Sequence, residues 1–153
     1  MQALVVYFSK FGNTRMVAEA IGTEFQPCGN ARVVSFDELT AEDLSGVDLM
    51  IMGCPTHRMN LPEAVCPIFE ALPKRVLRGA PAAAFDTSYK MSKWLMPFTA
   101  SKKLVGKLRK LGGKKIIAPE TFFVEERQGP LYPGELERAK TWAKLVMQRA
   151  GLR

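Results

Sequence analysis

The sequence predicts an α/β fold: a single doubly wound domain in which helices cover both faces of a parallel sheet. Two patterns predict this class. Short apolar runs, typical of strands buried on both faces, alternate about five times with segments of helical periodicity. The 153 residues are within the usual size of one domain, and no internal repeat or low-complexity linker divides them. We therefore expect one domain over residues 1–153.

The first half of the chain contains three predicted strands. They are nearly continuous apolar runs at 3–8 (ALVVYF), 31–36 (ARVVSF) and 47–53 (VDLMIMG), as expected for strands with two buried faces. Between the first two strands, apolar residues at helical spacing predict a helix that starts at Thr14 and ends before Pro27.

The next predicted helix runs from Pro62 to Leu72, because proline suits the first turn of a helix. Pro67 within it should kink the helix or mark its true start. The run APAAAF at 80–85 is a weak strand pattern, but its place in the alternation favours a strand. A basic helix with three leucines on one side is predicted over 99–111.

A fifth strand, KKIIAPETFFV, is predicted over 114–124 with an interruption near Pro119, and a last helix over 134–150. Strands that alternate with helices in this way lie in parallel, and right-handed crossovers leave few topologies. Such sheets bind ligands beyond the carboxyl ends of their strands, where the strand order reverses. The loops expected at that edge are 9–14, 54–61 and 86–98.

The first of these loops links a buried strand to a helix and reads Ser9, Lys10, Phe11, Gly12, Asn13 and Thr14. Its hydroxyls, backbone N–H groups and helix N-terminus are suited to hold a phosphate, and glycine lets the backbone turn sharply. The Walker A and G-x-G-x-x-G patterns are absent. A plain turn that caps the helix is the alternative interpretation.

Three segments, taken together, resemble the flavodoxin family. YFSKFGNT before RMVAEAIG resembles its phosphate-binding segment, [ST]-x-x-G-x-T between strand and helix. DLMIMGCPTHRMNLPEAV resembles its second flavin loop, a strand ending in G-x-P-T with an aromatic residue or histidine next. AAAFDTSYK resembles the third flavin-flanking strand and loop. The resemblance covers essentially the whole chain and implies a five-stranded sheet of order 2-1-3-4-5 that binds FMN.

The resemblance also implies which residues hold the cofactor. The FMN phosphate would be bound by Ser9, Lys10, Phe11, Gly12, Asn13 and Thr14. One side of the isoalloxazine would be lined by Pro55, Thr56, His57, Arg58, Met59 and Asn60, and the other by Asp86, Thr87, Ser88 and Tyr89. Phe11 departs from the threonine often found at its position in the family, which removes one hydroxyl donor.

Several of these residues allow a second interpretation. His57, the only histidine, contacts the flavin edge or is a turn residue that hydrogen-bonds locally. Trp94 stacks on the flavin in place of Tyr89, packs in a short helix, or belongs to a docking surface. Cys54 beside His57 could form a nucleophile, but no third orienting residue is evident, so a buried small residue is the preferred interpretation. One histidine and scattered cysteines form no metal-ligand cluster.

The net charge of +7 favours an acidic redox partner. The predicted helix over 99–111 and the residues just after it contain seven cationic residues and no acidic residue. These are Lys102, Lys103, Lys107, Arg109, Lys110, Lys114 and Lys115. A solvated helix face is the simpler interpretation of this run. Nucleic-acid binding would need interleaved aromatic residues or a known module, and neither is present.

Cytoplasmic localisation is expected. No apolar run reaches the roughly 18 residues of a membrane span, and the N-terminal apolar stretch lacks the basic leader of a secretory signal. Cys28, Cys54 and Cys66 are too few and too scattered for a disulfide framework. Nothing in the sequence indicates the oligomeric state.

The leading functional hypothesis is an FMN-dependent electron carrier of the oxidoreductase class, in which the flavin supplies the chemistry and no side chain is catalytic. The alternatives are an NAD(P)H-dependent flavin or quinone reductase on the same fold, and an interaction module that has lost FMN. Members of the family are usually acidic, whereas Lys10, Arg58 and Lys90 lie in the proposed loops. We therefore expect the second one-electron reduction of the bound flavin, from semiquinone to hydroquinone, to have a less negative potential than is usual for acidic members of the family.

Overall fold

The computed structural model describes residues 1–57 and 60–152. A parallel sheet of six strands has the order β2-β1-β3-β4-β5, and β6 also pairs with β4. The strands are β1 Gln2–Tyr7, β2 Asn30–Ser35, β3 Leu49–Pro55, β4 Pro81–Tyr89, β5 Lys114–Lys115 and β6 Glu120–Val124. The helices are α1 Asn13–Phe25, α2 Cys66–Ala71, α3 Ala100–Lys110 and α4 Glu135–Arg149. Short 3₁₀ helices occupy Gln26–Cys28, Phe36–Glu38, Ala41–Leu44, Glu63–Val65 and Met96–Phe98.

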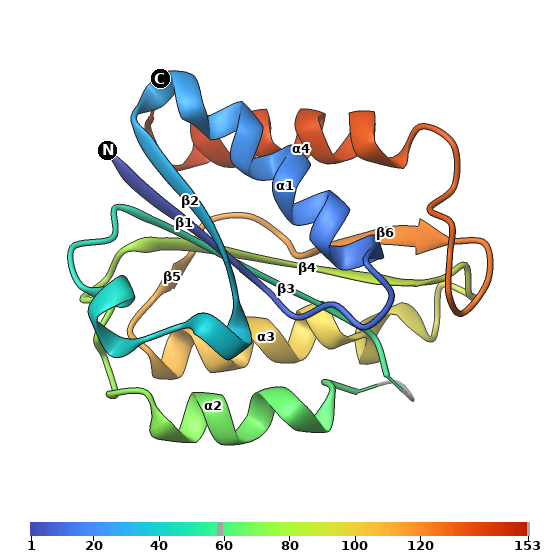
Figure 1. The fold of residues 1–153 in the computed structure, drawn as a ribbon, viewed down its shortest axis with the longest axis horizontal. Helices are drawn as coiled ribbons and strands as arrows, with labels where there is room; N and C mark the ends of the chain where they lie inside the picture. Colours follow the sequence, from blue (N-terminus) through green and yellow to red (C-terminus); the bar gives the residue numbers. More distant parts are fainter. Residues whose placement is uncertain (58–59, 153) are drawn as a thin grey trace.

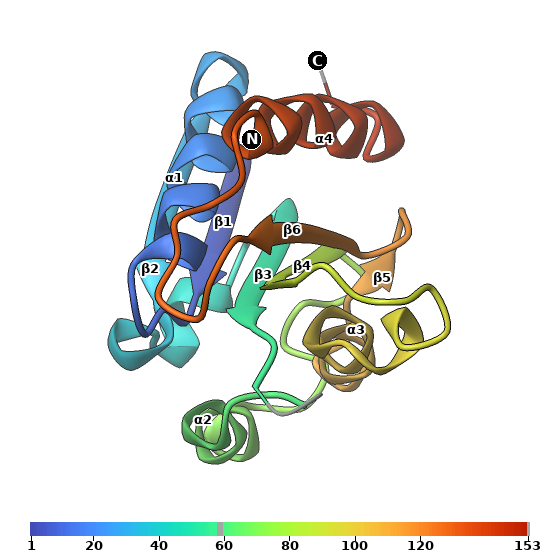
Figure 2. The same cartoon turned by 90° about the vertical axis from the view of Figure 1, so that its right-hand side faces the viewer.

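Helices α1 and α4 cover one face of the sheet and α2 and α3 cover the other (Figures 1 and 2). Successive side chains of a strand point to opposite faces, so Val5 and Ile51 pack under α1 and α4, whereas Val6 and Met52 pack under α2 and α3. Each central strand is therefore apolar along nearly its whole length, which is the pattern that predicted the fold. The predicted strand order is confirmed.

The predicted fifth strand is present as two short strands, β5 and β6. Both pair with β4, through Pro81–Lys114 at one end and Phe85–Glu120 further along. The break between them contains Pro119, which cannot donate a hydrogen bond to the sheet. The sheet thus has six strands where five were expected, although the sixth continues the edge formed by the fifth.

The start of α2 and the end of β4 can be compared with their predicted positions. Pro67 marks the true start of α2, which begins at Cys66 after a 3₁₀ turn. Strand β4 continues to Tyr89, four residues beyond the predicted end at 85, because β6 pairs with its last five residues. No helix of the described residues is long and apolar enough to cross a membrane.

Candidate functional site

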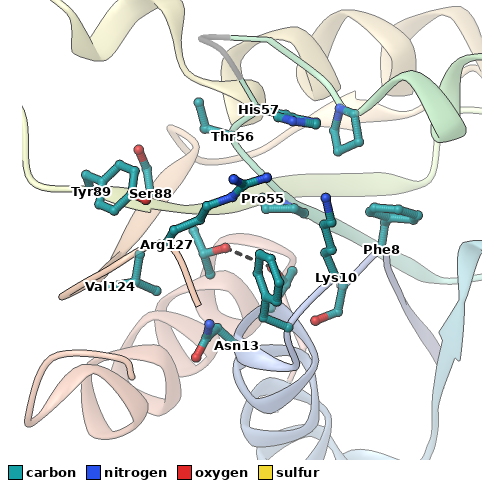
Figure 3. A pocket seen from close by; sticks show the side chains of 15 residues that line it. Phe8, Lys10, Asn13, Pro55, Thr56, His57, Ser88, Tyr89, Val124 and Arg127 are labelled. Atoms are coloured by element: carbon teal, nitrogen blue, oxygen red, sulfur yellow. Dashed lines mark hydrogen bonds between the residues drawn. The ribbon is translucent and has the colours of Figure 1, made fainter. Parts of the chain in front are cut away.

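A cleft lies at the carboxyl ends of β1, β3 and β4, beside the point where the strand order reverses. It holds about 640 Å³ of empty space when the part open to solvent is counted. The described residues that line it, several of them labelled in Figure 3, are Phe8, Ser9, Lys10, Phe11, Asn13, Thr14, Pro55, Thr56, His57, Pro62, Thr87, Ser88, Tyr89, Val124 and Arg127. All three predicted loops contribute to this one cleft.

Four of the predicted site residues that the structure describes are not among those that line the cleft. Gly12, Asn60, Asp86 and Trp94 are placed outside its walls, and Arg58 and Met59 lie outside the described residues. Trp94 is 72% exposed, so it does not pack on the body of the domain, which was one of its interpretations. Tyr89 is 48% exposed at the edge of the cleft, where one face of a ligand could contact it.

The first loop ends in a helix N-terminus that no side chain caps. The Ser9 hydroxyl accepts a hydrogen bond from the Gly12 N–H at 3.0 Å and closes the loop. Gly12 has φ of +93°, a conformation that glycine adopts without strain, and as the N-cap of α1 it offers no side-chain acceptor. The first turn of α1 contains no acidic residue. The positive end of the helix dipole is thus left for an anion.

Two buried threonines join the first loop to β4. The hydroxyl oxygens of Thr14 and Thr87 lie 2.8 Å apart, and both residues line the cleft. A buried hydroxyl without a partner is costly, so this bond holds the loop against the sheet. Thr14 was expected to contact the phosphate, and the structure shows that its hydroxyl already has this protein partner.

The second loop is closed by a reciprocal backbone pair. The His57 N–H donates to the Asn60 carbonyl at 2.8 Å, and the Asn60 N–H donates to the His57 carbonyl at 2.9 Å. The Asn60 side-chain oxygen accepts from the Leu61 N–H and from the Lys103 ammonium. His57 is thus a turn residue that also lines the cleft, and its contact with the flavin edge stays a prediction.

A buried carboxylate supports this loop from below. Asp86 Oδ2 accepts from the Ser101 N–H at 2.7 Å and from the Thr56 hydroxyl at 3.2 Å, and Thr56 Oγ1 accepts from the Ala100 N–H at 3.0 Å. Asp86 and Thr56 together therefore cap α3, whose dipole compensates the negative charge. Asp86 was expected to line the flavin. In the structure it instead positions Thr56, which does line the cleft.

Cys54 is fully buried next to this carboxylate. Burial, with a further contribution from the charge of Asp86, raises the pKa of the Cys54 thiol well above its usual value. The thiol therefore stays protonated at neutral pH, which agrees with the interpretation of Cys54 as a buried small residue. Within residues 1–57 and 60–152, no group of histidine, cysteine and carboxylate side chains could hold a metal ion.

Sequence reasoning missed four residues of the cleft: Phe8, Pro62, Val124 and Arg127. Arg127 comes from the loop between β6 and α4, which also follows the carboxyl end of a strand. That position was the available signal, since every such loop of a parallel sheet reaches the ligand edge. Lys10 and Arg127 are both cationic, and no acidic side chain is found among the described lining residues.

The fold is shared with several solved structures. A flavodoxin from the domain Archaea is 20% identical with a TM-score of 0.77, and the match covers 99% of both chains. Flavodoxin 1 from Bacillus cereus is 18% identical with a TM-score of 0.76, covering 97% of this chain and 98% of that one. Rubredoxin oxygen:oxidoreductase from Desulfovibrio gigas is 17% identical with a TM-score of 0.75, covering 98% of this chain and 36% of that one.

At these identities the solved structures show the fold alone. The sequence itself adds the family, because the family model described as Flavodoxin matches residues 5–142. This range contains β1 to β6 apart from the first three residues of β1, all loops of the cleft, and the first half of α4. The chain therefore belongs to the flavodoxin family.

Proposed function

We propose that this protein binds FMN in the cleft and carries electrons between partner proteins. The observation that supports the proposal most directly is the make-up of the cleft. It combines an uncapped helix N-terminus and two cations with aromatic and hydroxyl side chains, and no acid is found among its described lining residues. FMN carries a doubly charged phosphate and a planar apolar ring, and both parts would find suitable partners here.

Each of the three loops would contact a different part of the cofactor. Backbone N–H groups of 9–14 other than that of Gly12, which donates to Ser9, would bind the phosphate, and the Ser9 hydroxyl would remain free to donate. Thr56 and His57 would border one side of the ring, and Ser88 and Tyr89 the other. Bound FMN would supply the redox chemistry by accepting and releasing electrons. The protein would bind and orient it and exclude water from its inner edge, so no catalytic side chain is required.

An acidic redox partner is part of the proposal. Lys90 and Lys93 are exposed on the loop that follows β4, and Lys102 is exposed on α3. All three come shortly after the cleft residues Ser88 and Tyr89 in the sequence. Complementary charge speeds the encounter of two proteins and orients them. A reducing compartment such as the cytoplasm is consistent with the three unpaired thiols of Cys28, Cys54 and Cys66.

The experiment has two stages that separate the candidate functions. The purified chain is first freed of any flavin and titrated with FMN while flavin fluorescence is recorded; saturable quenching supports the proposal. The loaded protein is then mixed with NADPH and a quinone. Turnover at enzyme rates would favour an FMN-dependent reductase, whereas its absence, together with reduction by a reductase protein, supports the carrier. Failure to bind FMN at all would leave an interaction module as the better description.

A further inference from the structure

The loop between β6 and α4 forms a tight turn with a fixed base. Val124 and Leu131 pair as an antiparallel bridge, and the Glu125 N–H donates to the Pro130 carbonyl at 2.9 Å. The turn is closed by a bond of 3.0 Å from the Gly129 N–H to the Glu126 carbonyl. Arg127 therefore stands at the tip of a short hairpin rather than on an open loop.

The tip of this hairpin is attached to the start of α1. The side-chain amide of Asn13 donates to the Gln128 carbonyl at 3.2 Å, and Asn13 is buried beneath the contact. Gly129 lies against the same amide so closely that a Cβ there would come within 2.6 Å of Asn13 Oδ1, at a φ of +103° that also favours glycine. The contact joins positions 115 residues apart. It places Arg127 beside the uncapped N-terminus of α1.

Arg127 and Lys10 face the same cleft from opposite loops. Both line it, and Figure 3 shows both side chains extending across it. Neither takes part in an ion pair among the described residues, although Glu125 and Glu126 directly precede Arg127 in the chain. Arg138 in α4, by contrast, is paired with both Glu120 and Glu135. Two cations that face the same cleft repel each other when no acidic side chain lies between them. A bound anion would offset this repulsion.

We propose that Arg127 binds the phosphate of FMN and makes the protein select phosphorylated flavin over riboflavin, with Lys10 as the second cation. This inference rests on the proposed function. A phosphate monoester carries a charge near −2 at neutral pH, and a guanidinium can bind it through two parallel hydrogen bonds. The backbone N–H groups of the 9–14 loop orient the phosphate, and Arg127 closes the site from the α4 side.

The test compares two ligands and three variants of the full chain. Dissociation constants of FMN and riboflavin are measured by fluorescence quenching at low and at moderate salt for the wild type, Arg127→Gln, Arg127→Lys and Arg109→Gln. Arg109 is an exposed arginine in the last turn of α3 and does not line the cleft, so its replacement makes the same change of charge elsewhere. Circular dichroism checks that each variant is folded.

Arg127→Gln should weaken FMN binding about tenfold and change riboflavin binding less than about twofold, as expected for loss of one charge-assisted contact at an exposed position. Arg127→Lys should give an intermediate FMN affinity, and Arg109→Gln should match the wild type. The affinity for FMN should also depend less on salt in Arg127→Gln.

Three results would overturn the inference in distinguishable ways. Equal weakening of FMN and riboflavin would mean that Arg127 contacts the ring or ribityl chain and not the phosphate. If Arg127→Gln bound FMN as tightly as Arg109→Gln, the protein would still bind FMN, but Arg127 would have no part in the binding. If the wild type bound neither flavin, the proposed function itself would fail, and the inference with it.

Discussion

Gly53, in the G-x-P-T segment of β3, is required by packing. A Cβ at this position would lie 2.0 Å from Cζ of Phe85 and 2.3 Å from its Cε1 and Cε2 atoms. The Phe85 ring is fully buried and packs edge-on against Phe122 and Trp142, with ring centroids 6.0 and 6.3 Å away. It has no room to withdraw, so Gly53→Ala must push β3 and β4 apart. We expect a loss of about 3 kcal/mol or more in the free energy of unfolding, at the upper end of the range for overpacked cores.

Urea denaturation and thermal melting would measure this loss, which corresponds to a fall in Tm of about 6–12 °C for a domain of this size. A second-site change provides the control. Phe85→Leu alone should cost about 1–2 kcal/mol through lost burial. Combined with Gly53→Ala it should relieve the clash, so that the double variant is more stable than the sum of the two losses by at least about 1 kcal/mol. A Gly53→Ala effect below about 0.5 kcal/mol, or strict additivity, would refute this reasoning.

Three further predictions concern titration, thiol reactivity and redox potential. Burial opposes ionisation of Glu135, but hydrogen bonds from Arg138 and from a backbone N–H prevail and lower the pKa of its carboxyl. Its stabilising effect should therefore be complete above the unfolded pKa of about 4.3 and disappear as the pH falls towards the lower folded value; unfolding titrations of Glu135→Gln should show less acid destabilisation over that range, and an unchanged profile would contradict this. Cys54 should resist alkylation in the folded protein at mildly alkaline pH, while partly exposed Cys28 reacts; labelling of Cys54 before unfolding, seen by mass spectrometry, would be the opposite result. Lys10→Gln should make the second one-electron reduction potential of bound flavin more negative, on the order of tens of millivolts, and spectroelectrochemistry that finds no shift would show that the charge of this lysine does not act on the ring.

The fold was largely predictable because its signals are local. Apolar runs such as 3–8 and 47–53 mark strands buried on both faces, and the start of α2 and the break in the edge strand each coincide with a proline. The end of β4 was placed too early for a reason that is not local. Its last residues are strand because β3 pairs with Asp86 and Thr87, and because β6, more than 30 residues away, pairs as far as Tyr89.

The site was predictable only in part, for the same physical reason. The three loops were found from their motifs, but the role of a side chain within a loop depends on its partners. Asp86 faces the N-terminus of α3, and Asn13 holds Gln128, so both support neighbouring residues of the cleft. Arg127 was missed because the loop after β6 was not counted among the loops at the ligand edge, and because its place beside α1 depends on the contact between Asn13 and Gln128.

The proposed function requires that the cleft at the carboxyl edge of the sheet binds FMN. The most direct measurement is a titration of the flavin-free chain with FMN, followed in the visible absorption spectrum. We predict a change in the flavin bands that saturates at one FMN per chain. The dissociation constant obtained from it should rise in Arg127→Gln but not in Arg109→Gln. A spectrum that remains that of free FMN at every protein concentration would contradict the claim.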